Sequence, residues 1–208
     1  ATPSLFTCIA EAIGDGPVAR APERSVGERW APSGGASFSV AGGGSDHVGF
    51  ACHAGVAVCS VAAGGSPGTS YHSNYDTLAW YRLVVGEDYE PALMVTRATN
   101  ALLRALAGEE TIPLDIAALG DAIARAATDL ARNIASTDDD SNTSPSLFDA
   151  APIAEAAARL RASWERLRAA VAAGTVTIDR FNSAVVASIS TVLVLIVGHP
   201  DAPSERGG

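Results

Sequence analysis

The spacing of hydrophobic residues changes near residue 85 and divides the chain into two parts. Before this point, short apolar runs alternate with segments rich in glycine, serine and proline, whereas alanine, leucine and arginine dominate after it. Short apolar runs between turn-forming segments are typical of an α/β arrangement, and apolar residues at every third or fourth position are typical of helices. The pattern therefore predicts an α/β part followed by an all-α part.

The first part carries the signals of an α/β order. Helical spacing of apolar residues predicts a short helix over 4–13, and residues 38–44, FSVAGGG, predict a strand that runs into a glycine loop. A helix is expected over 45–55, with a glycine at its C-terminal end. Residues 56–63 form a continuous apolar run with β-branched members, which indicates a buried strand. This order is consistent with a mostly parallel sheet.

The second part is predicted to be helical throughout, apart from a polar linker at 137–146. In 153–171 the apolar positions alternate steps of four and three, which favours packing along another helix. The last helix is almost wholly apolar, so burying it requires partners on every side and predicts a subunit interface. Its most apolar stretch, about 14 residues long, is shorter than the ~20 residues that span a bilayer. The expected helices cover 88–106, 115–134, 153–171 and 178–197.

Composition limits the classes of partner and covalent chemistry. The 208 residues carry a formal net charge of −9, which disfavours nucleic-acid binding because that function needs a basic face. The three cysteines, Cys8, Cys52 and Cys59, show no CxxC spacing and lie among small or apolar residues. Buried free thiols are therefore expected, rather than a metal site or a disulfide.

A glycine loop, AGGGSD at 41–46, separates the expected strand from the expected helix. Such loops let the backbone approach a ligand and direct N–H groups at an anion. The loop is not a P-loop, because no GKS or GKT follows it, and it does not match the GxGxxG motif either. A tight turn that binds nothing is the alternative interpretation.

The histidines give weaker signals when each is taken alone. His47 and His53 are six positions apart and do not share a helix face, which disfavours a metal pair. His72 and Asp76 could orient a serine nucleophile, Ser60 or Ser73, but no GxSxG elbow supports a serine hydrolase. His72 as a zinc ligand is chemically suitable, although a catalytic zinc needs about three protein ligands. Its co-ligands are then expected outside this chain.

Three segments together resemble one family. GGGSDHVGF, then GVAVCSV, then YHSNYDT are similar to the C-terminal part of the glutamate carboxypeptidase II-type zinc peptidases. That family includes the N-acetylated-alpha-linked acidic dipeptidases and, as non-catalytic relatives, the transferrin receptors. TPSLFTCIAEAI and ERW also resemble the family, and AGEETIPLDIAALGDAI resembles its helical dimerisation domain.

The resemblance implies a fold and a set of site residues. It implies the C-terminal part of a zinc-exopeptidase α/β sheet domain over 1–112, and a truncated transferrin receptor-like helical-bundle dimerisation domain over 113–208. His72 corresponds to a ligand of one of two zinc ions. Tyr71 corresponds to the residue that lines the substrate cleft and donates a hydrogen bond to the oxyanion. Gly44 and Ser45 correspond to residues that contact substrate.

The resemblance also implies partners and limits. A peptide substrate, a homodimer formed by the helical domain and no nucleic acid are expected. Members of the family often have an N-terminal membrane anchor, with the rest of the protein outside the cell or in a vacuolar lumen. Association with a membrane is expected only through such an anchor, which these residues do not show. The other zinc ligands and the general base belong to the family's preceding half, so the chain by itself is expected to have neither peptidase activity nor tight zinc.

Two departures from the family leave the function open. Ser60 and Ala62 stand where the acidic-substrate enzymes carry arginines, so a preference for acidic substrates is not implied. The alternative function is a non-catalytic, transferrin receptor-like dimerisation or binding module. Retention of the Tyr-His-Ser block favours the peptidase.

Overall fold

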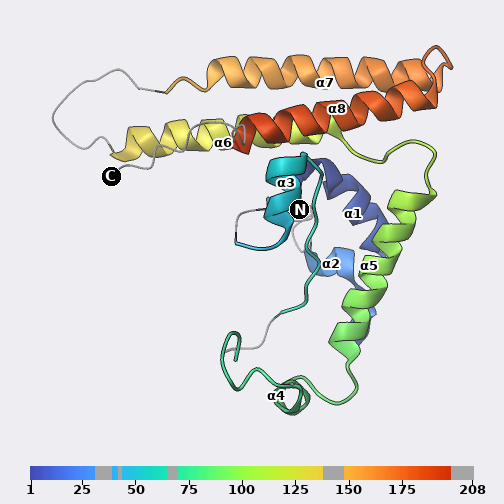
Figure 1. The fold of residues 1–208 in the computed structure, drawn as a ribbon, viewed down its shortest axis with the longest axis vertical. Coiled ribbons are helices and arrows are strands. Elements are labelled where there is room, and N and C mark those ends of the chain that lie inside the picture. The colour runs from blue at the N-terminus through green and yellow to red at the C-terminus, as the bar shows by residue number, and fades with distance from the viewer. Residues whose placement is uncertain (31–38, 42–43, 65–69, 138–147, 198–208) are drawn as a thin grey trace. The chain divides into compact units, whose positions relative to one another are not determined.

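The computed structural model describes residues 1–30, 39–41, 44–64, 70–137 and 148–197. These residues form two compact units. Helices dominate both units, and the sheet found in the described residues has two antiparallel strands (Figure 1). The first unit comprises Ala1–Phe6, Val40–Cys59 and Glu110–Gly208, and the second comprises Thr7–Ser39 and Ser60–Glu109.

The elements agree with the helical predictions and add several short ones. The first unit contains the 3₁₀ helix η1 (Pro3–Leu5) and the helices α3 (His47–Ala54), α6 (Ile116–Thr137), α7 (Ala151–Ala172) and α8 (Ile178–Val197). The second contains β1 (Pro17–Val18), β2 (Ala21–Ser25), α2 (Val26–Trp30), α4 (Leu78–Val84) and α5 (Glu90–Gly108), together with all of α1 (Phe6–Ile13) except its first residue. The six helices predicted from the sequence are thus confirmed, whereas α2, α4 and the hairpin were not predicted.

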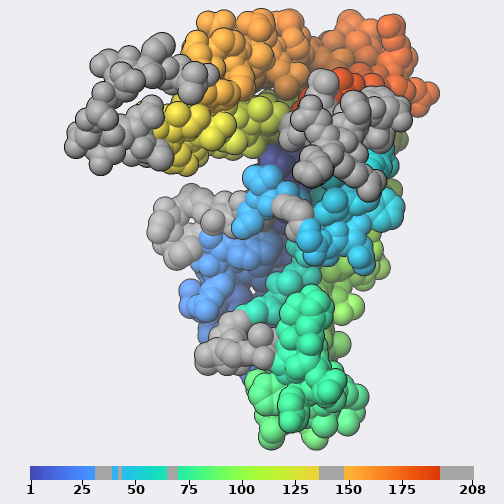
Figure 2. Space-filling view, turned by 60° about the vertical axis from the view of Figure 1, so that its left-hand side comes forward, coloured from blue at the N-terminus to red at the C-terminus, as the bar shows by residue number. Residues whose placement is uncertain are grey.

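The core of the first unit lies where α6, α7 and α8 meet. Helices α6 and α7 lie side by side, as both views show (Figures 1 and 2). On α7, Ala157 and Trp164 are buried, which confirms the seam expected from the steps of four and three. The Trp164 ring packs against Phe181 of α8 with ring centroids 5.4 Å apart. The buried cluster consists of Ile116, Ala117, Trp164, Phe181, Val185 and Ile189.

The start of α6 is fixed by hydrogen bonds to other parts of the first unit. The Oδ1 atom of Asp115 accepts the backbone N–H of Ala118 at 3.2 Å, which confirms Asp115 as the predicted cap. The N–H of Asp115 donates to the carbonyl oxygen of Ser4 at 2.8 Å. Asn182 of α8 accepts the N–H of Ile112 at 2.8 Å and donates to the carbonyl oxygen of Glu110 at 2.9 Å. The segment before α6 is therefore held from two sides.

The cap at α6 has a measurable stabilising effect. Asp115→Ala is expected to lower the free energy of unfolding by about 1 kcal/mol, because it leaves an N-terminal N–H of α6 without its acceptor. Asp46→Ala is the matched control, since Asp46 precedes α3 but makes no capping hydrogen bond with its side chain. Urea denaturation of the two variants measures the difference, and equal losses would contradict the cap.

The end of α3 lies against α8 at a glycine. Gly55 has a left-handed backbone with φ of 61°, as expected for the predicted C-terminal glycine of this helix. A β-carbon at this position would lie 2.6 Å from Oγ of Ser190 and 2.7 Å from its Cα atom. Gly55 therefore satisfies both the helix ending and the close packing of the two helices.

The two strands expected in the first part do not form. Residues 39–41 and 56–63 have no strand pairing, and the described residues hold no parallel sheet. Thr2 donates its N–H to the carbonyl oxygen of Val58 at 2.8 Å, but the N–H of Val58 donates to Oγ1 of Thr2 at 2.9 Å. A side-chain oxygen thus replaces the backbone carbonyl that a ladder requires, and Pro3 has no N–H to extend the pairing.

The second unit is organised around α5 and the β1–β2 hairpin. Arg20 at the hairpin tip has a left-handed φ of 61°, and its N–H donates to Oε1 of Glu90 at 3.0 Å. Its guanidinium donates to the carbonyl oxygen of Val85 and lies 3.3 Å from Oδ1 of Asp88. The N–H of Glu90 donates to Asp88 and is the main cause that lowers the pKa of the Asp88 carboxyl, with Arg20 lowering it further. The hairpin tip is thus bound to the first turn of α5.

Helix α8 has the bounds expected from its apolar run, but only one side of its described residues is buried. Val185 and Ile189 are 1% and 3% exposed, whereas Val186 is 55% exposed. None of the helices in the described ranges combines the length and apolar character that crossing a membrane needs. The expected subunit interface on α8 stays a prediction.

The cysteines are free thiols, as the sequence predicted. Cys8 is buried, and Cys52 and Cys59 are partly buried. Burial raises the pKa of the Cys59 thiol, because the thiolate would lose hydration there. The thiol form of Cys59 is therefore favoured at neutral pH.

Candidate functional site

A tight turn at 70–77 in the second unit carries the Tyr-His pair that the sequence singled out. Ser73 closes this turn. Its N–H and its hydroxyl both donate to the carbonyl oxygen of Ser70, at 3.0 and 2.6 Å, and its Oγ accepts the N–H of Tyr75 at 3.2 Å. Thr77 then caps α4 by accepting the N–H of Trp80 at 3.2 Å. The turn is therefore ordered by its own polar groups and by the helix that follows it.

Tyr71 and His72 lie at the exposed side of this turn. Their rings are stacked, with centroids 3.7 Å apart and an interplanar angle of 20°. Tyr71 is 68% exposed, and His72 is exposed as well. The backbone of His72 is left-handed, with φ of 58°. That conformation costs energy for a residue other than glycine, although histidine adopts it more readily than most.

The serine-hydrolase interpretation gains no geometric support. The Ser73 hydroxyl already donates to the Ser70 carbonyl oxygen, so its proton is directed into the turn. Asp76 accepts a long hydrogen bond of 3.5 Å from the Ser70 hydroxyl. The two side chains thus serve the turn itself rather than forming a chain of proton transfer with His72.

The other candidate substrate contacts, Gly44 and Ser45, belong to the first unit. Gly44 is exposed and has a φ of 89°, a conformation that favours glycine. The carbonyl oxygen of Ser45 accepts the N–H of Val48 at 3.0 Å and so begins α3. Gly42 and Gly43, the rest of the glycine loop, lie outside the described residues. The pair Gly44–Ser45 and the pair Tyr71–His72 are therefore placed within different units.

As a metal site, the turn offers one imidazole. Across the ranges that the structure describes, no three His, Cys, Asp or Glu side chains gather as a metal would need. His47 and His53 occupy the two ends of α3. The exposed His72 ring fits a zinc site as a single ligand, and a complete site needs about two more protein ligands.

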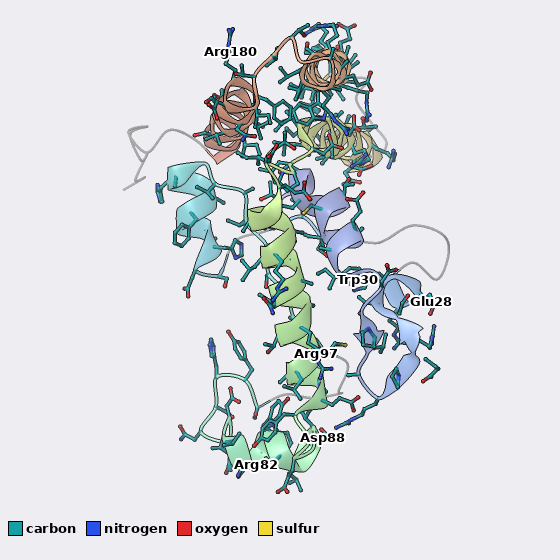
Figure 3. All side chains as sticks on the ribbon, turned by 90° about the vertical axis from the view of Figure 1, so that its right-hand side faces the viewer. Glu28, Trp30, Arg82, Asp88, Arg97 and Arg180 are labelled. Carbon is teal, nitrogen blue, oxygen red and sulfur yellow. The ribbon has the colours of Figure 1, made fainter. Side chains whose placement is uncertain are left out.

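Two features of the second unit were missed by sequence reasoning. The first is the cluster in which Arg20 meets Asp88 and Glu90, which lie 68 and 70 positions further along the chain. In Figure 3, Asp88 lies on the segment that leads from α4 into α5. The second is a cavity beside α5 that includes Arg97. Isolated charged residues usually indicate a solvated surface, so neither Arg20 nor Arg97 gave a distinguishing signal.

Comparisons of the chain with protein-family models, with curated proteins and with solved structures found no match. The Tyr71–His72 turn offers exposed groups with catalytic chemistry, and the polar network beneath it fixes the backbone that presents them.

Proposed function

We propose that this chain is the C-terminal portion of a dizinc metallo-exopeptidase that hydrolyses peptide bonds near a chain terminus. In this proposal 1–112 is part of the zinc-peptidase domain, and 113–208 is the helical domain through which two copies dimerise. The observation that carries the proposal is the exposed, ordered turn that presents Tyr71 and His72. The resemblance of its sequence to the zinc-peptidase motif is the reason for proposing zinc-dependent peptide hydrolysis.

The geometry at His72 is suitable for a metal ligand. A neutral imidazole is a preferred zinc donor, and this one is exposed rather than packed in a core. Its left-handed backbone is retained although it costs energy, and such conformations concentrate at functional sites. The hydrogen bonds of Ser73 compensate for that cost by closing the turn around His72.

Tyr71 and the glycine loop would act on the substrate. The exposed phenol of Tyr71 would donate a hydrogen bond to the carbonyl oxygen as negative charge develops on it. Gly44 and Ser45 would contact the substrate backbone, since the absence of a side chain at Gly44 allows close approach. These are positioning and charge-stabilising roles that the chain's own residues can perform.

The zinc ions would supply Lewis-acid chemistry at the scissile bond when bound. His72 is the one ligand that we assign in this chain. The remaining ligands and the general base would come from other parts of the full protein. The 208 residues alone are then expected to bind zinc weakly, because a single imidazole does not make a site.

The test is the substitution His72→Ala in the full protein that carries this chain. We expect the variant to lose bound zinc, measured by atomic absorption on purified protein, and to lose peptide hydrolysis in the same preparation. His53→Ala is the matched control, because His53 is also an exposed histidine but lies on α3 in the other unit. It should keep both zinc and activity.

Two results would reject this assignment. Full zinc content and activity in the His72→Ala variant would remove His72 from the metal site. A full protein that contains no zinc and cleaves no peptide would instead favour the non-catalytic, transferrin receptor-like dimerisation module.

A further inference from the structure

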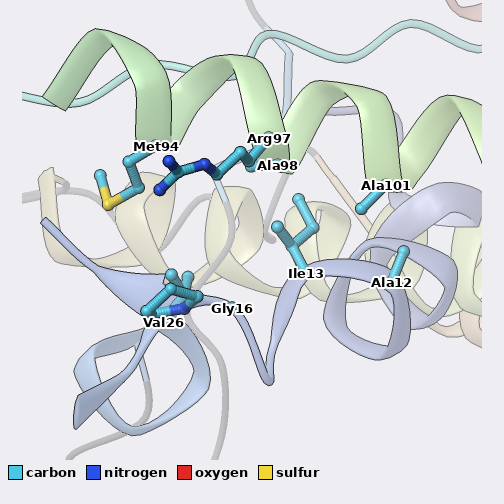
Figure 4. Close-up of a pocket in the computed structure, with 9 residues that line it drawn as sticks. Ala12, Ile13, Gly16, Val26, Met94, Arg97, Ala98 and Ala101 are labelled. Atoms are coloured by element: carbon cyan, nitrogen blue, oxygen red, sulfur yellow. The ribbon is translucent and has the colours of Figure 1, made fainter. Parts of the chain in front are cut away.

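A cavity of about 150 Å³ lies within the second unit, between α5 and the segment from α1 to α2. Its walls are apolar, with the exception of one cation. The side chains that matter most are Ile13 and Val26 on one side and Met94, Ala98 and Ala101 of α5 on the other (Figure 4). The cation is Arg97, also on α5.

The guanidinium of Arg97 makes no hydrogen bond or ion pair with any residue in the described ranges, and the side chain is exposed. In Figure 4 it extends along the cavity side of α5 toward Met94. Arg20, by contrast, already forms ion pairs with Asp88 and Glu90 at the hairpin tip. Arg97 is therefore available to pair with an anion at the edge of an apolar hollow.

The walls of the cavity are held in place by backbone hydrogen bonds. The N–H of Val26 donates to the carbonyl oxygen of Gly16 at 2.8 Å, and the N–H of Gly27 donates to that of Gly14 at the same distance. The N–H of Ala19 donates to Sδ of Met94 at 3.1 Å, which joins the hairpin to α5. A site whose walls are already ordered loses little conformational entropy when a ligand enters.

We propose that this cavity binds a small aromatic carboxylate, with its ring among the apolar side chains and its carboxylate on Arg97. An apolar cavity of roughly 150 Å³ is large enough to admit benzene. A guanidinium paired with a carboxylate makes strong, charge-assisted hydrogen bonds that can be bidentate. The proposal concerns a ligand site apart from the Tyr71–His72 turn and does not depend on zinc or on peptidase activity.

The test uses benzoate as the probe and Met94 as the reporter. Met94 is the only methionine in the chain, so a ¹³C-methyl methionine label gives one signal, from the cavity wall. We expect benzoate to shift this signal saturably. Arg97→Gln should weaken benzoate at least about tenfold, because it removes the charge from the pair. Benzyl alcohol, which has the same ring but no charge, should bind both proteins equally.

Two further variants separate the site from general effects. Arg104→Gln removes another exposed arginine of α5 that does not line the cavity, and it should leave the affinity for benzoate unchanged. Ala98→Leu should fill the hollow and abolish binding of both probes while α5 stays folded. The proposal is overturned if benzoate does not shift the Met94 signal at 10 mM, about the weakest binding of interest. It is equally overturned if Arg97→Gln binds benzoate as tightly as the unaltered chain does.

Discussion

Under the proposed peptidase function, Tyr71→Phe is expected to lower kcat for peptide hydrolysis by the full protein about 10²–10³-fold, with little change in KM. The substitution removes one hydroxyl from an exposed ring and keeps the ring itself. A donor that meets charge only as it develops stabilises the transition state and not the bound substrate. Loss of one such donor typically has an effect of this size. Steady-state kinetics with a peptide that the full protein cleaves gives both constants.

Tyr75→Phe is the control for this experiment. Tyr75 lies in the same turn, is 79% exposed and undergoes the same chemical change, but the proposal gives its hydroxyl no contact with the reacting carbonyl. Its kcat should stay within about twofold of the value for the unaltered protein. If Tyr71→Phe also stays within that range, Tyr71 does not stabilise the oxyanion.

Trp164→Ala is expected to lower the free energy of unfolding by about 3–5 kcal/mol. Trp164 is 7% exposed and packs on Phe181 in the cluster between α6, α7 and α8. Its removal takes a large apolar area out of the core and leaves a cavity that the surrounding helices fill only in part. Urea denaturation followed by far-ultraviolet circular dichroism measures the change. Glu165→Ala, at the exposed neighbouring position on α7, should change stability by less than about 0.5 kcal/mol.

A second substitution at this position tests what the indole contributes. The Nε1 atom of Trp164 is buried and has no hydrogen-bond partner among the described residues. Trp164→Phe keeps an aromatic ring beside Phe181 and removes that unsatisfied N–H, so it should cost far less than Trp164→Ala. Equal losses in the two variants would show that a phenyl ring at position 164 recovers none of the packing that the indole provides.

The helices could be predicted because their signals are local. Apolar spacing gave α5, α6, α7 and α8, and the capping role of Asp115 follows from its position just before an apolar-periodic run. Gly55 could be predicted as a helix end for the same reason. Each of these features depends on residues within a few positions of one another, which a single sequence displays directly.

The strands and the features proposed to bind ligands depend on distant partners. Residues 56–63 have a strand's composition, but a strand forms only where another backbone offers a ladder, and here Thr2 offers its side chain. Tyr71 and His72 could be selected as candidate site residues from their sequence motif, whereas the hydrogen bonds of Ser73 that shape their turn could not be predicted. Arg97 is distinguished only by the cavity beside it, and no local pattern encodes that.

The contact of Gly55 with α8 also limits how this sequence can diverge. Any side chain at 55 would meet the Ser190 backbone and would have to adopt a left-handed conformation as well. Relief at Ser190 alone would not suffice, because its Cα atom is as close as its hydroxyl. Among homologues that keep this helix pair, position 55 should therefore be invariant while position 190 varies among small residues. The backbone of Ser190 thus prevents the replacement of Gly55 by any residue with a side chain.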